Sequence, residues 1–190
     1  MLSKFLPENS VEIICSWIEE LNVCVRVKNP RHTKKGDFKV INNKLFISIN
    51  NNLNKYAFLI TLTHELAHAF VFFRYGNHVK PHGVEWKTIF KKMLIKLMMN
   101  NCFPKNIIKP LAFYAKNPAA STFTDINLSS VLLKYNMKKE ATIAEIKDGH
   151  IFFYRGKKYL KIKKVVKRIR CKREDKKEYL FHPLTKVDIS

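Results

Sequence analysis

Leu62-Thr63-His64-Glu65-Leu66-Ala67-His68-Ala69-Phe70 is the stretch on which the interpretation of this 190-residue chain depends. Residues four apart share a face of an α-helix, so His64 and His68 can offer two imidazole nitrogens to one metal ion. Glu65 then lies beside the open side of the metal. A carboxylate there can take a proton from a metal-bound water that attacks a carbonyl, which is zinc-peptidase chemistry. The alternative is that two histidines lie one turn apart by chance.

The residues around this motif predict a buried helix from about 54 to 75. Its side chains are apolar nearly all round, which is typical of a central helix. Asn54 offers an N-cap and Gly76 a C-cap. Earlier residues predict an amphipathic helix at 8–21 and strands at 23–27, 37–40 and 44–49, and a second core helix is expected at 84–100.

A catalytic zinc site needs a third protein ligand and keeps one position for water. Three residues after the helix are candidates. His78 would need a tight reversal to reach the site, whereas His82 lies in a loop long enough to fold back over the helix. Glu85, in the first turn of the next helix, would give a site with two histidines and one carboxylate. The spacing favours His82 and leaves Glu85 and His78 open.

The net charge of +21, from 36 Lys+Arg against 15 Asp+Glu, favours phosphate-rich partners, nucleic acid first. A Lys- and Asn-rich composition that only keeps the protein soluble is the alternative. No uninterrupted apolar run has the length of a membrane span, and the first residues lack the pattern of a signal peptide. We therefore expect a cytoplasmic protein without a membrane partner. The four cysteines lie far apart and form no C-x-x-C pair, which gives no support to a local zinc ribbon or a disulfide framework.

The sequence pattern changes at residue 141, where short β-type runs begin. Prolines and a Ser/Thr stretch interrupt the region after 100, and a short helix is expected at 128–135. Short β-type runs follow at 142–146, 150–154, 158–162, 165–171 and 178–181. The predicted organisation is a first domain at 1–125, a linker with a short helix at 126–140, and a small basic all-β module at 141–190.

The β module carries much of the excess charge, because residues 134–190 hold 18 Lys+Arg against 7 Asp+Glu. Cations alternate there with apolar residues, so a strand would present them on one face, and Tyr154 and Tyr159 could stack on bases. The alternative is a solvated strand face over a small core. The candidate nucleic-acid residues are Lys157, Lys158, Lys161, Lys163, Lys164, Lys167, Arg168 and Arg170.

Taken with Tyr75-Gly76 and Lys80-Pro81-His82-Gly83-Val84-Glu85-Trp86-Lys87, the motif resembles the SprT-like metalloprotease family over roughly residues 8–100. The resemblance implies that His64, His68 and His82 hold Zn²⁺ and that Glu65 is the catalytic general base. It also implies an α+β, zincin-like fold with a small antiparallel sheet beside the active-site helix. Glu85 then becomes a carboxylate outside the ligand set.

The resemblance further implies a zinc-dependent metalloendopeptidase, a hydrolase. Its best-known members, the Spartan proteases, degrade proteins trapped on DNA. Proteins bound or crosslinked to DNA are therefore the expected substrates, single-stranded or damaged DNA is an expected partner, and DNA repair is the expected process. Bacterial SprT proteins typically end in a cysteine-bearing zinc ribbon, whereas this chain has only Cys171 in that region.

Two rival interpretations remain. The first is a non-catalytic nucleic-acid-binding or regulatory protein whose zinc only stabilises the fold. Glu65 argues against it, because a structural zinc site needs no base beside an open coordination position. The second is a zinc hydrolase that acts on a non-peptide amide. The oligomeric state is not encoded in any motif, and a monomer is assumed.

Overall fold

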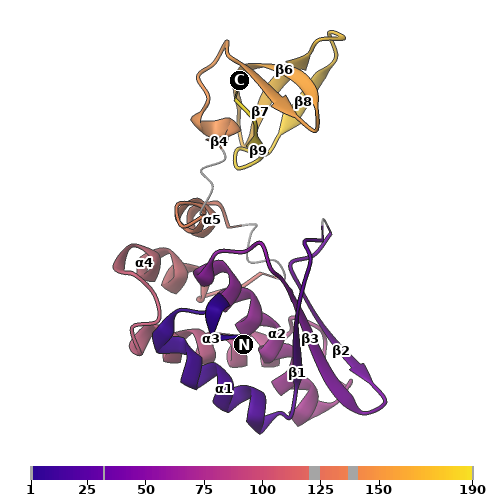
Figure 1. Ribbon diagram of the computed structural model, residues 1–190, viewed down its shortest axis with the longest axis vertical. Coiled ribbons are helices and arrows are strands. Elements are labelled where there is room, and N and C mark those ends of the chain that lie inside the picture. The colour runs from indigo at the N-terminus through magenta and orange to yellow at the C-terminus, as the bar shows by residue number, and fades with distance from the viewer. Residues whose placement is uncertain (1, 32, 120–124, 137–140, 190) are drawn as a thin grey trace. The chain divides into compact units, whose positions relative to one another are not determined.

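The computed structural model describes residues 2–31, 33–119, 125–136 and 141–189. The chain divides into two compact units, Met1–Asn136 and Met137–Ser190, and each has its own hydrophobic core. Figure 1 labels their elements. The first unit mixes helices with a three-stranded sheet, and the second is built from strands, so the fold is α+β.

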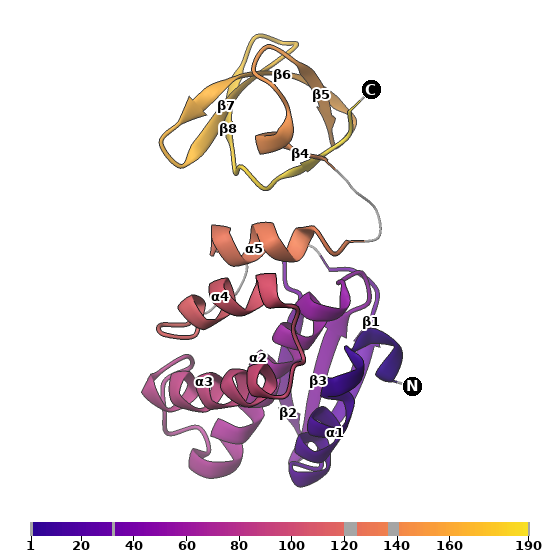
Figure 2. The ribbon, with the colours of Figure 1, turned by 90° about the vertical axis from the view of Figure 1, so that its left-hand side faces the viewer.

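The first unit begins with two short 3-10 turns (Ser3–Phe5 and Glu8–Ser10) and helix α1 (Val11–Glu20). Strands β1 (Cys24–Lys28), β2 (Gly36–Ile41) and β3 (Lys44–Asn50) follow. The long helix α2 (Lys55–Tyr75) packs between this sheet and helix α3 (Val84–Met99), as Figures 1 and 2 show. Helices α4 (Lys105–Tyr114) and α5 (Ile126–Leu133) complete the unit.

The sheet is mixed, so the prediction of an antiparallel sheet is wrong for one of its two pairings. The strand order is β1-β3-β2, and β3 is antiparallel to β2 but parallel to β1. The reason is the connection after β1: the amides of Asn51 and Asn50, at the end of β3, donate to the carbonyls of Lys28 and Lys35, so β1 and β2 lie on opposite sides of β3. The β2–β3 hairpin turns at Asn42 and Asn43, which both have positive φ (49° and 59°), as its tight turn requires. The hairpin thereby places β3 between β1 and β2.

Helix α2 begins and ends where its capping residues predict. The side chain of Asn54 accepts a hydrogen bond from the Ala57 amide at 3.0 Å, and the Gly76 amide donates to the Phe72 carbonyl at 2.8 Å. By length and composition alone this helix could cross a membrane, but 78% of its most apolar window is buried inside the structure. We therefore describe it as the central core helix of the first unit.

The region after residue 100 contains helix α4, although its prolines predicted an interrupted segment there. Pro110 lies inside this helix, although a proline there lacks an N–H and crowds the preceding turn. Buried Ile107, Leu111 and Tyr114 hold one face of the helix in the core and outweigh that cost. The short helix expected at 128–135 is α5, and its buried Leu128 and Leu132 belong to the core of the first unit.

In the second unit a four-stranded antiparallel sheet has the order β5-β6-β7-β8. Its strands are β5 (Ile151–Tyr154), β6 (Lys157–Val165), β7 (Arg168–Arg173) and β8 (Glu178–Phe181). Strand β4 (Ala141–Thr142) pairs with β9 (Lys186–Val187). The strand expected at 142–146 is wrong beyond Thr142, because Glu145 accepts from the Thr142 amide at 2.7 Å and holds a 3-10 turn at Ile143–Glu145.

Candidate metal centre

Helix α2 supplies two of the three histidines that form the centre. His64 and His68 lie one turn apart on the side of the helix that meets the loop before α3. Leu66 and Ala67, between them, are fully buried and fix the rotation of the helix. The spacing of the two histidines therefore places both imidazole rings at the same point, as expected for residues four apart.

His82 reaches the centre from the loop between α2 and α3. The Gly83 amide donates to the Lys80 carbonyl at 2.9 Å, which closes a tight turn with Pro81 and His82 at its middle positions. Proline suits the first of these positions, and the second carries a positive φ, 57° for His82. A Cβ on Gly83 would lie 2.9 Å from the Lys80 carbonyl oxygen, so only glycine fits there. The Pro-His-Gly sequence thus aims the His82 ring at α2.

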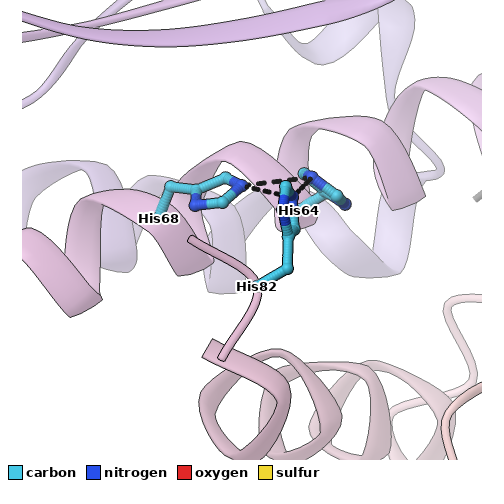
Figure 3. A group of neighbouring side chains, drawn as sticks. All are labelled: His64, His68 and His82. Carbon is cyan, nitrogen blue, oxygen red and sulfur yellow. Dashed lines mark hydrogen bonds between the residues drawn. The ribbon is translucent and has the colours of Figure 1, made fainter. Parts of the chain in front are cut away.

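The three Nε2 atoms form a triangle, shown in Figure 3, with sides of 3.2 Å for His64–His68, 3.0 Å for His68–His82 and 3.2 Å for His64–His82. Each nitrogen either carries a proton or offers a lone pair, so three nitrogens cannot satisfy all three contacts by hydrogen bonding. One cation shared by three lone pairs satisfies them together. Tetrahedral zinc with Zn–N bonds of about 2.05 Å would separate its ligand nitrogens by about 3.3 Å. The donor set and its spacing therefore fit a metal ion.

Trp86, the third residue of α3, packs against all three imidazoles. Its ring centroid lies 4.6 Å from that of His64, 5.3 Å from His68 and 4.7 Å from His82. The indole N–H also donates to the His64 carbonyl at 3.4 Å. Because Trp86 is fully buried, it holds the loop histidine against the helix histidines and excludes water behind them.

Burial sets the charge state of the histidines. Burial, with the neighbouring His68 and His82, lowers the pKa of His64 to about 3. Burial and His82 lower the pKa of His68 to about 4, and burial also lowers the pKa of His82. All three rings are therefore neutral near pH 7 and have lone pairs available for a metal.

Glu65 lies beside this cluster and is covered by the first residue of β2. Only 8% of Glu65 is exposed. A Cβ built on Gly36 would lie 2.8 Å from Cγ of Glu65 and 2.9 Å from its Cδ. The backbone at Gly36 therefore closes over the Glu65 side chain, and any larger residue would displace it. The sequence does not predict this contact, because no motif relates Gly36 to Glu65.

The position of Glu65 makes its carboxyl group a weak acid. Burial raises the pKa of Glu65 to about 8, and Asp37 adds to the rise against the opposing charges of Arg31 and Lys34. Asp37 is held ionised: its burial opposes ionisation, but Lys34, 2.8 Å away, together with Lys39 and Arg31, lowers its pKa overall. A bound cation would favour the carboxylate form of Glu65, because opposite charge lowers the pKa of an acid.

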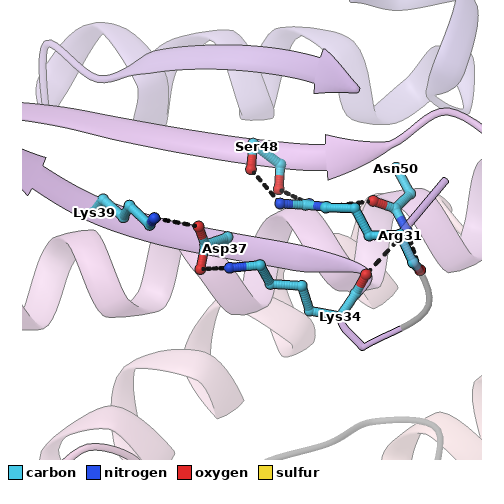
Figure 4. Close-up of polar contacts among 6 residues, drawn as sticks. All are labelled: Arg31, Lys34, Asp37, Lys39, Ser48 and Asn50. Atoms are coloured by element: carbon cyan, nitrogen blue, oxygen red, sulfur yellow. Dashed lines mark hydrogen bonds and ion pairs between the residues drawn. The ribbon is translucent and has the colours of Figure 1, made fainter. Parts of the chain in front are cut away.

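The loop that carries Gly36 is tied to the end of β3, as Figure 4 shows. The Arg31 guanidinium donates to Oδ1 of Asn50 at 2.8 Å and to Oγ of Ser48 at 3.0 Å. The Asn50 amide donates back to the carbonyls of Arg31 at 3.2 Å and Lys34 at 3.0 Å. These bonds hold Arg31 and Lys34 against β3, and through them the backbone at Gly36 that covers Glu65.

Among the described residues, the group able to hold a metal ion contains His64, His68 and His82 and neither of the alternatives His78 and Glu85. Glu85 instead lies in the first turn of α3, and one of its carboxyl oxygens lies near Gly83.

One residue of the predicted basic face does not point outward. Lys161 is buried, with 8% of its side chain exposed; its ammonium donates to the Ile146 carbonyl and pairs with Asp148 at 3.2 Å. Lys161 follows the buried Tyr159 by two residues and therefore lies on the same, core-facing side of β6, and the bulge between 161 and 163 breaks the alternation only after it. The interpretation of Lys161 as a nucleic-acid contact is therefore wrong. The other residues of that set are exposed or half-buried: Lys157, Lys158, Lys163, Lys164, Lys167, Arg168 and Arg170.

The first unit is thus an α+β domain whose central helix carries two members of a three-histidine cluster with a glutamate beside it. Residues 12–107, just over half of the chain, match the SprT-like family, and the chain belongs to this family. The matched segment contains all three histidines and Glu65, and it ends before the second unit. No curated protein and no solved structure matches the chain.

Proposed function

We propose that this protein is a zinc-dependent metalloendopeptidase in which His64, His68 and His82 hold the metal and Glu65 is the general base. The observation that carries the proposal is the triangle of Nε2 atoms with sides of 3.0–3.2 Å beside a buried glutamate. Membership of the SprT-like family supports the same class of enzyme.

Zinc at this site would supply a Lewis acid that lowers the pKa of water and polarises a carbonyl. The three neutral imidazoles bind it, and Trp86 keeps their rings in place. Glu65 accepts the proton that the attacking water loses and passes it to the nitrogen of the leaving amine. Burial raises the pKa of Glu65 and so helps it to hold the proton between the two transfers, whereas a bound cation would favour the carboxylate form that accepts the proton.

The proposed substrates are proteins bound or crosslinked to DNA, with single-stranded or damaged DNA as a partner. The support is electrostatic, since the net charge of +21 attracts polyphosphate and concentrates DNA-bound proteins near the site. A DNA-dependent rate that falls as salt is added would follow from this proposal.

Comparison of the parent protein with Glu65→Gln tests the proposal. The variant should bind one zinc per chain as the parent does, because the ligands are unchanged, and its cleavage of a DNA-bound protein should fall at least about a hundredfold. His68→Ala is the matched control and should lose both zinc and cleavage.

Two results would contradict the proposal. Cleavage by Glu65→Gln at the parental rate would remove Glu65 as the base. Zinc binding without cleavage of any protein by the parent, with or without DNA, would favour a zinc that only stabilises the fold.

A further inference from the structure

The second unit has a pocket lined by aromatic side chains at one end of its sheet. Its volume is about 310 Å³, near the lower limit for small-ligand pockets, which is roughly 300 Å³. Strands β5, β6 and β8 and the turn at residues 155–156 supply its lining residues: Tyr154, Arg155, Lys157, Tyr159, Tyr179, Leu180 and Phe181. This segment lies outside the part of the chain that matches the SprT-like family.

Neighbouring aromatic rings of the pocket lie nearly at right angles to one another. Tyr154 and Phe181 have centroids 5.3 Å apart and planes at 89°, and Tyr159 meets Phe181 at 5.1 Å and 83°. Tyr159 also meets Tyr179 at 5.7 Å and 84°. Tyr159 is buried and forms the floor, whereas the other three rings are half-buried and form the walls. A flat ring that enters can therefore face one wall and present its edge to the next.

The rim of the pocket is positively charged. Arg155 and Lys157 are exposed there. The Arg173 guanidinium, 5.0 Å from the centroid of the Tyr179 ring, is paired with Asp175 and does not add a free charge to the rim. None of the described residues that line the pocket is acidic. A pocket for a methylated ammonium group would be weakened by such cations, whereas a planar ligand attached to a phosphate would be bound more tightly.

We infer that this pocket binds an unstacked base of single-stranded nucleic acid, with the adjoining phosphates on Arg155 and Lys157. Aromatic rings stack on any base, and cations at the rim follow the phosphate chain. In a duplex the base faces are stacked on one another, so the pocket distinguishes single strands from double strands. The inference rests on the part of the proposed function that makes single-stranded nucleic acid a partner. It does not depend on the proposed zinc chemistry, so either can fail without the other.

Two strands of equal charge test this inference on the full-length protein. One is oligothymidylate of about 15 nucleotides, and the other is an abasic strand of the same length. By fluorescence anisotropy the parent should bind the strand with bases about tenfold more tightly, because one stacked base contributes that factor. Tyr154→Leu should abolish this preference and leave the affinity for the abasic strand unchanged, whereas Tyr154→Phe should keep it.

Lys167→Ala is the matched control for charge. Lys167 is exposed in the turn between β6 and β7, and it is not among the residues that line the pocket. Its loss should weaken both strands equally.

A crosslinking experiment on the unmodified protein covers the case in which Tyr154→Leu does not fold. Strands that contain 5-iodouracil should crosslink on irradiation to a pocket residue such as Tyr154 or Tyr179. Equal affinity of the parent for both strands, or crosslinks confined to residues 1–136, would overturn the inference. Displacement of the strand by a trimethyl-lysine peptide would assign the pocket to a methylated cation and would also overturn it.

Discussion

Gly36 and Glu65 show how one missing side chain shapes the candidate active site. The Glu65 side chain occupies the space where a Cβ on Gly36 would lie. Its burial raises the pKa of Glu65 to about 8 and limits the rotamers open to it. The backbone of β2 therefore both tunes and positions the proposed base. A carboxylate held in this way has little freedom to lose during the reaction.

Gly36→Ala tests this role. The added methyl group should displace the Glu65 carboxyl group and lower the cleavage rate at least about tenfold, because small misplacements of a catalytic group are costly. Zinc content should stay at the parental value, since Gly36 does not contact the histidines in the cluster. Gly149→Ala is the control: nothing lies within 4 Å of its Cβ position, so activity should be kept despite backbone strain at φ 82°. Parental activity in Gly36→Ala would show that the contact is unimportant.

Lys161 has a structural role that the alternating basic sequence around it does not indicate. We expect Lys161→Ala to destabilise the second unit by about 2 kcal/mol, because it leaves the buried Ile146 carbonyl without its ammonium partner. The exposed Lys163→Ala should change stability by less than about 0.5 kcal/mol. Hydrogen exchange of the amides of residues 141–189 measures both effects. Equal protection in the two variants would contradict the assignment.

At the scale of elements, local signals predicted α2 well. Asn54, Gly76 and the all-round apolar surface between them are short-range features, and they correctly mark a buried helix. The third member of the histidine cluster was harder to predict, because spacing alone left His82, Glu85 and His78 open. It depends on the positive φ of His82 and on packing against Trp86 from another helix, and neither is visible in a local pattern.

Other elements were mispredicted because tertiary contacts decide them. The parallel pairing of β1 with β3 depends on the course of the connection between β1 and β2, and no residue in β1 encodes it. Helix α4 persists through Pro110 because its buried face is held by neighbouring helices. In the second unit, Lys161 shares the core-facing side of β6 with the buried Tyr159, and the bulge interrupts the alternation only after it.

In the loop between β1 and β2, Arg31 and Lys34 depend on Asn50 for their positions. Asn50 is only 2% exposed, and its side chain makes three hydrogen bonds to Arg31 and Lys34. Asn50→Ala should cost about 2–3 kcal/mol, since it leaves buried polar groups unpaired. It should also raise hydrogen exchange in residues 29–36 and slow cleavage, because Gly36 no longer closes over Glu65.

Asn51→Ala is the matched control for that loop. Its side chain is exposed and makes one 3.4 Å contact with Asn29, so the change should stay within about 0.5 kcal/mol. If both variants show the same exchange at residues 29–36, the loop is not held by Asn50.

At the scale of the whole molecule, the two units differ in what stabilises them. The first unit has a large core continuous with the histidine cluster, whereas the second has a small core of its own around Phe152 and Tyr159. Both tryptophans, Trp17 and Trp86, belong to the first unit. Tryptophan fluorescence therefore reports the unfolding of the first unit alone, and hydrogen exchange of residues 141–189 reports the second.

Zinc removal should act on one unit only. At a free zinc concentration of about 100 times its Kd, the first unit gains about 2.7 kcal/mol, because the native cluster binds the ion and the unfolded chain does not. A chelator should therefore lower the denaturant midpoint seen by tryptophan fluorescence and leave hydrogen exchange of residues 141–189 unchanged. His82→Ala, which removes one corner of the nitrogen triangle and two of its three sides, should make the fluorescence midpoint far less sensitive to zinc. A midpoint unaffected by the chelator in the parent would mean that the three histidines do not hold zinc, and an equal shift in His82→Ala would mean that His82 is not a ligand.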